Sequence, residues 1–558
     1  MAKPKLELTW IGKDEEIKLE PRILIEDTEK SYGDPKSENM LIHGDNLLAL
    51  KALEQDFTGK IKCVYIDPPY NTGNAFEHYD DSVEHSIWLS LMRARLILLR
   101  NLLRKDGFIC CHIDDSEGPY LKVLMDEIFG RTNYLTTFYV QVRYPEKTLK
   151  QDMAFHKEIE QIHIYRKEYG ANPNLNLADS SFDKFSFYIK EKKPGKRIVL
   201  GGKDVDVFLE GEYEIVESEG SENGLKEIWA TGTILDGNSS GRFFRDNLSG
   251  RVATDGLGVL YKVYGIGDDK FSYRYFTGPK KANATKGKYF QGVPIAQLKD
   301  PDKKQSLPIE NYYDLAADFG NCRQEGGVEF RSGKKPEKLL GVILKHFSNE
   351  GDWVIDSFVG SGSTSAVAHK MNRKWIGIEL KDHAYTHCLL RMRNVIDGLD
   401  KAGISKDVSW NGGGGFKFYE LALSLLRKDK YGNWVIDEKY NANMLAAAMC
   451  KHEGFKYFPD AEIYWKQGKS TETDYIFVTT SFMTVEQIDK MHEEMKPGES
   501  LLICAKAFAP ECKDRFNNVT IKKIPQMILG KCEFGKDNYD LNIIKANDQA
   551  VDDVEDVE

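Results

Sequence analysis

Residues Lys62-Cys63-Val64-Tyr65-Ile66-Asp67-Pro68-Pro69-Tyr70 read as a buried strand that stops at an acid, two prolines and an aromatic residue. The apolar, β-branched run that ends at Ile66 is typical of a central strand in a parallel sheet. Pro68 lacks an N–H group and disfavours the helical conformation at Asp67, so the chain leaves the strand stiff and extended. Because ligands of open α/β sheets bind at the carboxyl ends of the strands, we expect Asp67 in a ligand site.

The corner formed by Asp67, Pro68 and Tyr70 suits a planar ring that carries an amino group. The Asp67 carboxylate and the Pro68 carbonyl are two acceptors for an exocyclic NH₂, and the Tyr70 ring is a surface on which a base can stack. A chance Asp-Pro-Pro turn that ends in tyrosine is the alternative interpretation, because short motifs recur by accident. A second motif is needed to decide between the two.

The chain around this corner alternates between strand and helix signals, which is typical of a doubly wound α/β sheet. Apolar runs predict strands, and periodic apolar residues predict helices, on both sides of a long interruption. The predicted strands are 40–43, 62–66, 107–113, 353–358 and 374–380, and the predicted helices are 46–55, 86–103, 120–129, 337–347, 363–371 and 384–399. A period-two run over 158–165 predicts an antiparallel strand at the edge of this sheet.

The interruption, from about 170 to 310, has a different character. Short aromatic and β-branched runs alternate there with clusters of Gly, Asn, Asp and Ser, which predicts a β-rich insertion with long loops. The glycine run 412–415 predicts a turn or a linker. From 426 onward a further α/β segment is expected, with strands over 475–479 and 501–505, a helix over 485–495 and a disordered acidic end.

The composition is that of a soluble globular enzyme with two to four domains, since 558 residues exceed a single core. The net charge of −10 argues against a protein that coats nucleic acid indiscriminately but allows a local basic cleft. The 9 cysteines show no CxxC spacing and no apolar signal region is present, so we expect reduced thiols, a cytoplasmic location and no membrane segment. His383, His387 and Cys388 share helical spacing but lack a second ligand pair, so we expect no metal.

The second motif is the stretch 353–364, which reads as a strand, a glycine turn and a helix start. Gly360 and Gly362 allow a ligand to approach the backbone closely, although a tight strand-to-helix connection explains them equally well. A dinucleotide site would prefer a third glycine where Ser365 stands. The next strand ends at Glu379, which could bind ribose hydroxyls or be a solvated strand end.

With both motifs in order, the chain resembles the DNA amino-methyltransferases that use S-adenosylmethionine. Their D/N/S-P-P-Y/F/W tetrapeptide corresponds to Asp67-Pro68-Pro69-Tyr70, and their F-x-G-x-G loop to Phe358-Val359-Gly360-Ser361-Gly362. The catalytic motif precedes the cofactor motif, which is similar to the permuted β-class order. The stretches 39–47, 65–74, 88–92 and Lys335-Pro336 add to a resemblance that is strongest with the modification (Mod) subunits of type III restriction–modification systems.

This resemblance implies a layout for the chain. A Rossmann-like methyltransferase sheet would be formed by residues 1–142 and 311–425, a β-rich target-recognition region by 143–310, and a C-terminal α/β domain by 426–558. The implied catalytic residues are Asp67, Pro68, Pro69 and Tyr70, and the implied cofactor-binding residues are Asp45, Lys335, Pro336, Asp356, Phe358, Gly360, Gly362 and Glu379.

The implied reaction is methyl transfer to the N6 amino group of an adenine flipped out of duplex DNA, because a buried strand end cannot reach a base inside the helix. The amino group would donate to Asp67 and to the Pro68 carbonyl, Tyr70 would stack on the ring, and no metal would be required. Aspartate at the first motif position favours adenine by what the family implies, with N4 of cytosine as the lesser alternative.

Cations interleaved with aromatics mark the expected DNA contacts within the β-rich region. The predicted DNA-binding residues are Arg242, Arg245, Arg274, Lys280, Lys281, Lys286 and Lys288. A solvated β-face whose aromatics fill a small core is the alternative. The segment 71–85 after the tetrapeptide could also touch DNA.

The expected partners are double-stranded DNA, a second copy of the chain and a separate restriction subunit, because the sequence shows no P-loop for ATP-driven translocation. Three other functions remain open at this point: methylation of RNA or of a protein amide, DNA recognition without catalysis, and nicotinamide-dependent dehydrogenation. The bases that are read, and the role of 426–558, do not follow from the sequence.

Overall fold

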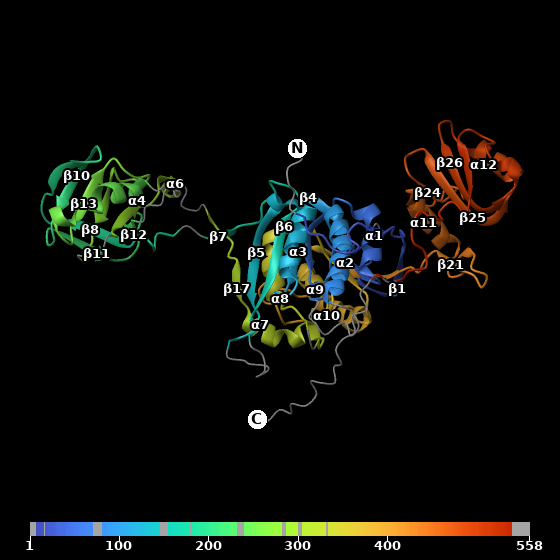
Figure 1. The fold of residues 1–558 in the computed structure, drawn as a ribbon, viewed down its shortest axis with the longest axis horizontal. Helices are drawn as coiled ribbons and strands as arrows, with labels where there is room; N and C mark the ends of the chain where they lie inside the picture. Colours follow the sequence, from blue (N-terminus) through green and yellow to red (C-terminus); the bar gives the residue numbers. More distant parts are fainter. Residues whose placement is uncertain are drawn as a thin grey trace, which may run out of the picture. The chain divides into compact units, whose positions relative to one another are not determined.

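The computed structural model describes residues 7–15, 17–70, 81–145, 155–178, 181–230, 239–281, 286–299, 304–330, 333–537 and 539. The chain forms two compact units (Figure 1). The larger unit joins Met1–Asn174 to Glu310–Glu558, and the smaller unit is Leu175–Ile309. The β-rich insertion therefore forms a unit of its own, and in the sequence it separates the two segments that make up the larger unit.

A ten-stranded mixed sheet organises the larger unit, in the order β1-β20-β2-β19-β18-β3-β4-β6-β5-β17. The neighbours from β20 to β4 are parallel, and β6 pairs antiparallel with both β4 and β5. The strands are β1 (Leu24–Gly33), β2 (Met40–His43), β3 (Ile61–Ile66), β4 (Leu103–Ile113), β5 (Tyr134–Gln141), β6 (Ile159–Arg166), β17 (Tyr312–Asp314), β18 (Trp353–Asp356), β19 (Lys374–Glu379) and β20 (Gly415–Leu421).

Helices cover both faces of this sheet, because the strands are apolar on both sides. Ile376 belongs to a core built with α1, α2 and α3, whereas its neighbour Trp375 bonds to His369 of α9, and Phe108 packs on Phe347 of α8. The helices and helical turns are α1 (Asn46–Phe57), α2 (Asp81–Leu102), α3 (Gly118–Met125), η1 (Asp126–Gly130), η2 (Arg131–Asn133), α7 (Ala316–Asn321), η4 (Cys322–Gly327), α8 (Glu337–Phe347), α9 (Ser363–Lys370), η5 (Ala384–Cys388) and α10 (Leu389–Ile396).

The register of the parallel strands gathers polar residues at one edge of the sheet. Ile355 lies opposite Val64, and Asp356 lies opposite Gly377, so β3, β18 and β19 end side by side. Since each strand ends in or just before an acid, Asp67, Asp356 and Glu379 come together at the carboxyl edge.

The predicted α/β elements are confirmed, with three differences. The strand over 158–165 is β6, but it lies inside the sheet, since β5 and β17 add beyond it. β1 and β20 at the other end of the sheet were not predicted; β1 is half-buried to exposed, whereas β20 buries Phe416 and Phe418 but begins in the glycine run that predicted a turn or a linker. The insertion begins at Leu175, later than the predicted 143, because β6 pairs with the large sheet.

The smaller unit is an eight-stranded sheet in the order β11-β8-β12-β15-β14-β13-β10-β9, with neighbouring strands antiparallel. Its aromatic core packs against α4 and η3. The elements are β7 (Asn176–Ala178), β8 (Phe187–Glu191), β9 (Lys196–Leu200), β10 (Lys203–Phe208), β11 (Tyr213–Glu217), β12 (Leu225–Trp229), α4 (Ser239–Phe243), η3 (Phe244–Leu248), α5 (Val252–Asp255), β13 (Leu260–Tyr264), β14 (Tyr273–Thr277), β15 (Lys288–Gly292), α6 (Ile295–Lys299) and β16 (Gln305–Leu307).

The C-terminal part contains the predicted α/β elements, with β25, β26 and β27 parallel. Its elements are β21 (Leu426–Lys428), β22 (Trp434–Ile436), α11 (Ala442–Glu453), β23 (Lys456–Tyr457), β24 (Gly468–Lys469), β25 (Asp474–Met483), α12 (Val485–Glu494), β26 (Ser500–Phe508), η6 (Pro510–Cys512) and β27 (Val519–Lys523). Within the described residues, no helix has the length and apolar character needed to cross a bilayer.

Candidate active site

A cavity of about 440 Å³ opens at the carboxyl edge of the large sheet. Its size lies in the range of small-molecule sites. Both sequence motifs line it, together with Asn46, Phe330 and Lys381. The predicted residues that the structure brings together there are Asp67, Pro68, Pro69, Tyr70, Lys335, Asp356, Phe358, Gly360 and Glu379.

The Asp-Pro-Pro-Tyr corner is held rigidly. The indole N–H of Trp88 in α2 donates to the carbonyl of Pro69 at 2.8 Å. The Tyr70 hydroxyl turns back and donates to Oδ1 of Asp67 at 2.8 Å. Burial, followed by the Asp67 charge, raises the pKa of Tyr70 far above its ordinary value, so the hydroxyl stays a donor.

Lys335 binds at this corner. Its ammonium lies 2.8 Å from Oδ2 of Asp67 and 3.6 Å from Oε2 of Glu160, and its side chain is 8% exposed. Burial alone would lower the pKa of Lys335, but the two carboxylates outweigh burial and raise it. Pro336 follows at the N-cap of α8 and does not line the cavity.

Glu160 and His112 are site residues that the sequence reasoning missed. Glu160 is the second residue of β6 and accepts from the Tyr70 hydroxyl at 3.2 Å, and His112 of β4 lies 2.8 Å from the same oxygen. Burial would raise the pKa of Glu160, yet Lys335 and His112 lower it to about 2. The sequence contained one signal for Glu160, an acid near the start of a predicted antiparallel strand. Such a strand begins at the edge of the sheet where its parallel neighbours end, so this acid lies at the carboxyl edge.

The glycine loop between β18 and α9 folds over the end of the sheet. Gly360 and Gly362 have φ of +55° and +81°, which side chains rarely adopt, and a Cβ on Gly362 would lie 3.4 Å from Cys388 Cα. Glu379 accepts from the Gly360 N–H at 2.9 Å, so the acid that was predicted to bind ribose also fixes the loop.

Asp356 lies beneath the loop and is 3% exposed. It accepts from the Phe358 N–H at 2.9 Å and from the Thr364 hydroxyl at 2.6 Å. Burial raises the pKa of Asp356 to about 7, although both hydrogen bonds act to lower it. This carboxyl therefore changes charge near neutral pH.

Asp45 has a different role from the one predicted. Its carboxylate caps α1 by accepting from the Leu48 N–H at 3.0 Å, and it also accepts from the Tyr539 N–H at 2.8 Å. Asp45 is 1% exposed and does not line the cavity, whereas the next residue, Asn46, does. The Asn46 amide donates to the Ser357 carbonyl and thereby supports the glycine loop.

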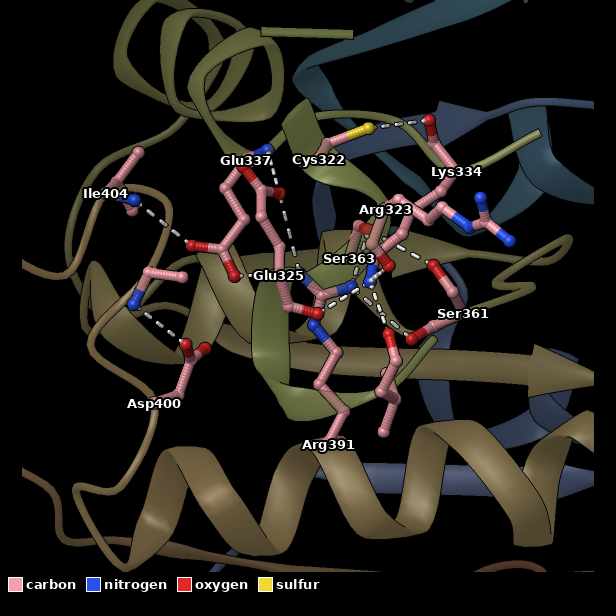
Figure 2. A network of polar contacts seen from close by, with 12 residues as sticks. Cys322, Arg323, Glu325, Lys334, Glu337, Ser361, Ser363, Arg391, Asp400 and Ile404 are labelled. Carbon is pink, nitrogen blue, oxygen red and sulfur yellow. Dashed lines mark hydrogen bonds and ion pairs between the residues drawn. The ribbon is translucent and has the colours of Figure 1, made fainter. Parts of the chain in front are cut away.

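A buried network of charges supports the same loop from behind. Figure 2 shows Arg391 of α10 beside Glu337, Glu325 and Ser363, with the guanidinium 2.8 Å from Glu337 and 2.7 Å from the Ser363 hydroxyl. Lys370 binds Glu337 at 2.7 Å and Asp400 at 2.6 Å. Two cations and two carboxylates thus balance within the core, which limits the cost of burying them.

Two further groups of this network titrate unusually. Burial raises the pKa of Glu325 to about 7. Burial lowers the pKa of Lys334 to about 8, although its ammonium donates to the carbonyls of Arg323, Glu325 and Val328. Lys334 therefore closes the turn that delivers the adjacent Lys335 to the Asp67 corner.

Four of the seven predicted DNA-binding residues share one cavity in the smaller unit. Lys280, Lys281, Lys286 and Lys288 line one cavity of about 540 Å³. Trp229 lines the same cavity and is 57% exposed, with the Lys288 ammonium 4.8 Å from its ring centroid.

The predicted arginines do not join these lysines. Arg274 is 4% exposed and donates to Ser240 at 2.5 Å and to Asp269 at 2.9 Å, so it is a core residue and the prediction of a DNA contact is wrong. Arg242 and Arg245 are exposed on α4 and η3 but do not line the cavity. Of the segment predicted after the tetrapeptide, residues 71–80 lie outside the described residues.

Comparison with known proteins agrees with this geometry. A family model described as DNA methylase matches residues 61–389, which is more than half of the chain and spans both motifs. The chain belongs to the DNA methylase family. The resemblance inferred from the two motifs is thereby confirmed at the level of the family.

Relatives of this methylase include enzymes of two restriction–modification types. The chain is 35% identical over 424 residues to the probable type III restriction-modification enzyme HindVI Mod subunit of Haemophilus influenzae, covering 70% of this chain and 55% of the relative. It is 25% identical to the EcoPI Mod subunit of Escherichia phage P1, and the match covers 67% of this chain and 62% of that subunit. It is 30% identical to the type II methyltransferase M.EcaI of Enterobacter cloacae, and the match covers 74% of this chain and 81% of that enzyme. The chain thus spans between half and two thirds of the two Mod subunits.

The raised pKa of Asp356 predicts a pH dependence of stability. The folded methylase holds this proton up to about pH 7, whereas the unfolded chain releases it near the ordinary value of 3.8, so stability falls as pH rises between these values. In Asp356→Asn this contribution is absent, so the free energy of unfolding should fall less between these pH values, by roughly 1 kcal/mol for each unit by which the pKa is raised. The test is to measure the thermal unfolding midpoints of the native protein and the Asp356→Asn variant between pH 4 and 8. Glu350→Gln, a change at an exposed residue, is the control. Parallel curves of midpoint against pH for the native protein and Asp356→Asn would contradict the prediction.

The buried network predicts a structural cost for losing Arg391. Arg391→Met leaves Glu337 buried with Lys370 as its remaining cation and removes the donor to Ser363. We expect a thermal midpoint lower by roughly 5 °C or more, because breaking a buried pair costs about 3–5 kcal/mol. Arg393→Met, a half-buried arginine on the same helix, should change the midpoint by less than about 2 °C. Equal effects of the two changes would overturn this role.

Proposed function

We propose that the protein is a site-specific DNA methyltransferase that methylates the N6 amino group of adenine with S-adenosylmethionine. The observation that carries this proposal is the convergence of the Asp67 corner and the glycine loop on one cavity in a member of the DNA methylase family. When bound, the cofactor supplies an electrophilic methyl group on a sulfonium, whose C–S bond breaks as the amino nitrogen forms the new C–N bond. The methylated nitrogen would then release one proton to solvent by way of the Asp67 carboxylate.

The residues of the cavity fit such a cofactor. The sulfonium and the amino-acid ammonium of the cofactor are cationic, and the acids Asp356 and Glu379 line the cavity. Gly360 presents backbone without a Cβ to the cavity, which suits close approach of a ligand. Phe358 and Gly360 would flank the methionine part and Glu379 the ribose, whereas Gly362, which does not line the cavity, would support the turn of the loop.

The corner would hold the target base. The adenine amino group would donate to Asp67 and to the Pro68 carbonyl, which orients the nitrogen lone pair toward the methyl group. The base must leave the duplex to reach a strand end inside the molecule. A second cavity of about 670 Å³ shares Phe330, Gly333 and Lys335 with the first, and it would provide the entry for the base.

The smaller unit would recognise the DNA sequence. Lysines that line a cavity with an exposed tryptophan combine phosphate binding with a surface for stacking. In this proposal the region is the family's target-recognition domain, inserted into a catalytic domain of permuted β-class order.

The relatives support a place in a type III restriction–modification system. Two of them are named as Mod subunits, so we propose that this chain is a modification subunit that acts in the cytoplasm as a homodimer and joins a separate restriction subunit. The similarity to a type II methyltransferase makes independent methylation the second candidate. Co-purification with the product of an adjacent restriction gene would separate the two.

The catalytic role of Asp67 can be measured directly. Asp67→Asn keeps the size of the side chain but replaces the anionic acceptor and its ion pair with Lys335. We expect transfer of tritiated methyl groups to duplex DNA to fall by about 100-fold or more, because a charge-assisted acceptor at the reacting group is lost. Cofactor affinity, measured by calorimetry, should change little. Full activity of the variant would refute the mechanism.

The role of the lysine cavity predicts a change in salt dependence. Replacing Lys280, Lys281 and Lys286 together by Gln should lower the slope of log Kd against log salt by about one unit for each lysine that binds a phosphate in the native protein. Trp229→Ala should weaken binding without changing this slope. Lys190, Lys192 and Lys193, which are exposed in the same unit but do not line the cavity, provide the matched triple control. An unchanged slope in the first triple variant would exclude the cavity as a DNA-binding surface.

A further inference from the structure

A second carboxylate stands beside the Asp67 corner, on a strand outside both sequence motifs. Glu160 shares two donors with Asp67: the Lys335 ammonium, at 3.6 and 2.8 Å, and the Tyr70 hydroxyl, at 3.2 and 2.8 Å. The Glu160 side chain is 20% exposed and that of Lys335 is 8% exposed, so water competes weakly for these contacts.

Glu160 is itself held from its other side. The Nε2 of His112 lies 2.8 Å from Oε2 of Glu160, and Nδ1 of His112 lies 2.8 Å from the Tyr65 hydroxyl. Because the Glu160 carboxylate can only accept, the ring proton of a neutral His112 is favoured on Nε2, and Nδ1 then accepts from the Tyr65 hydroxyl. His112 of β4, supported by Tyr65 of β3, thus holds the Glu160 carboxylate from this side.

The sharing has a consequence for Asp67. Both donors lie closer to Asp67, at 2.8 Å each, than to Glu160, so each oxygen of Asp67 already has a donor. An amino group that donates to Asp67 must therefore displace a donor, and Glu160 is the second acceptor within reach of both. Without the charge of Glu160 a displaced donor would lose its partner in a buried site, where such interactions are strong.

We propose that Glu160 is a positioning residue, which accepts from Lys335 and the Tyr70 hydroxyl when the target amino group takes their place on Asp67. This inference rests on the proposed methyl transfer. Glu160 lines the second cavity, Asp67 lines the first, and Lys335 lines both, so the shared ammonium lies where the base and the methyl donor would meet. Glu160 takes part through Lys335 and Tyr70, without a bond to the reacting nitrogen.

The test is a double-mutant cycle read by single-turnover methylation of duplex DNA. Glu160→Gln, which removes the charge and keeps the size, should slow the transfer step by about tenfold or more, because Lys335 and the Tyr70 hydroxyl then stay on Asp67 and compete with the amino group. Affinity for S-adenosylhomocysteine and for DNA should stay within about twofold, since Glu160 holds neither. In a Lys335→Met background Glu160→Gln should have little further effect, because the shared donor is gone.

Controls separate this positioning role from a general loss of structure. Glu168→Gln, an exposed glutamate that follows the same strand, should transfer at the wild-type rate. If Lys335→Met does not fold, a second cycle with Tyr70→Phe decides, since that change alters no buried charge. The variant that combines Glu160→Gln with Tyr70→Phe should then transfer methyl groups faster than the product of the two single effects predicts. An unchanged rate in Glu160→Gln, or independent effects in both cycles, would overturn the proposal. A wild-type protein without methyl transfer would instead refute the proposed function.

Discussion

The buried ammonium of Lys335 stands between two carboxylates from different strands, and the geometry of the candidate site depends on it. Asp67 follows a central parallel strand, whereas Glu160 lies near the start of an antiparallel one. The ammonium between the two carboxylates offsets their mutual repulsion at a site that excludes much of the solvent.

The position of Lys335 depends in turn on a second group of buried charges. Lys334 closes the preceding turn on three carbonyls, and Glu337, two residues after Lys335, is fixed by Arg391 and Lys370. Arg391 also reaches Ser363 at the end of the glycine loop. Figure 2 shows this network around Arg391 and Glu337. Through Lys334 and Ser363 it supports both the segment that carries Lys335 and the glycine loop. A balanced network of this kind contributes geometry more than stability, since desolvation offsets most of the attraction.

Sequence reasoning found the α/β elements because long apolar periods and strand-end motifs are local signals. It found the corner and the loop because their proline and glycine residues are required by backbone conformation, as the positive φ of Gly360 and Gly362 confirms. It placed Arg274 at the surface, because an arginine among aromatics carries no local sign of burial; its partner Asp269 lies across a turn. Likewise, nothing local distinguishes Asp45 as a helix cap from Asp45 as a ligand contact.

The sequence by itself determined the two motifs, the family they indicate and the existence of a separate β-rich unit, since each is written in neighbouring residues. Tertiary structure alone decided that Glu160 and His112 join the corner, that Lys335 pairs with Asp67, and that four lysines share a cavity with Trp229. The physical reason is that strand pairing and buried ion pairs join residues tens to hundreds of positions apart. Such pairings follow from which strands become neighbours, and the sheet order β3-β4-β6 is a property of the whole fold.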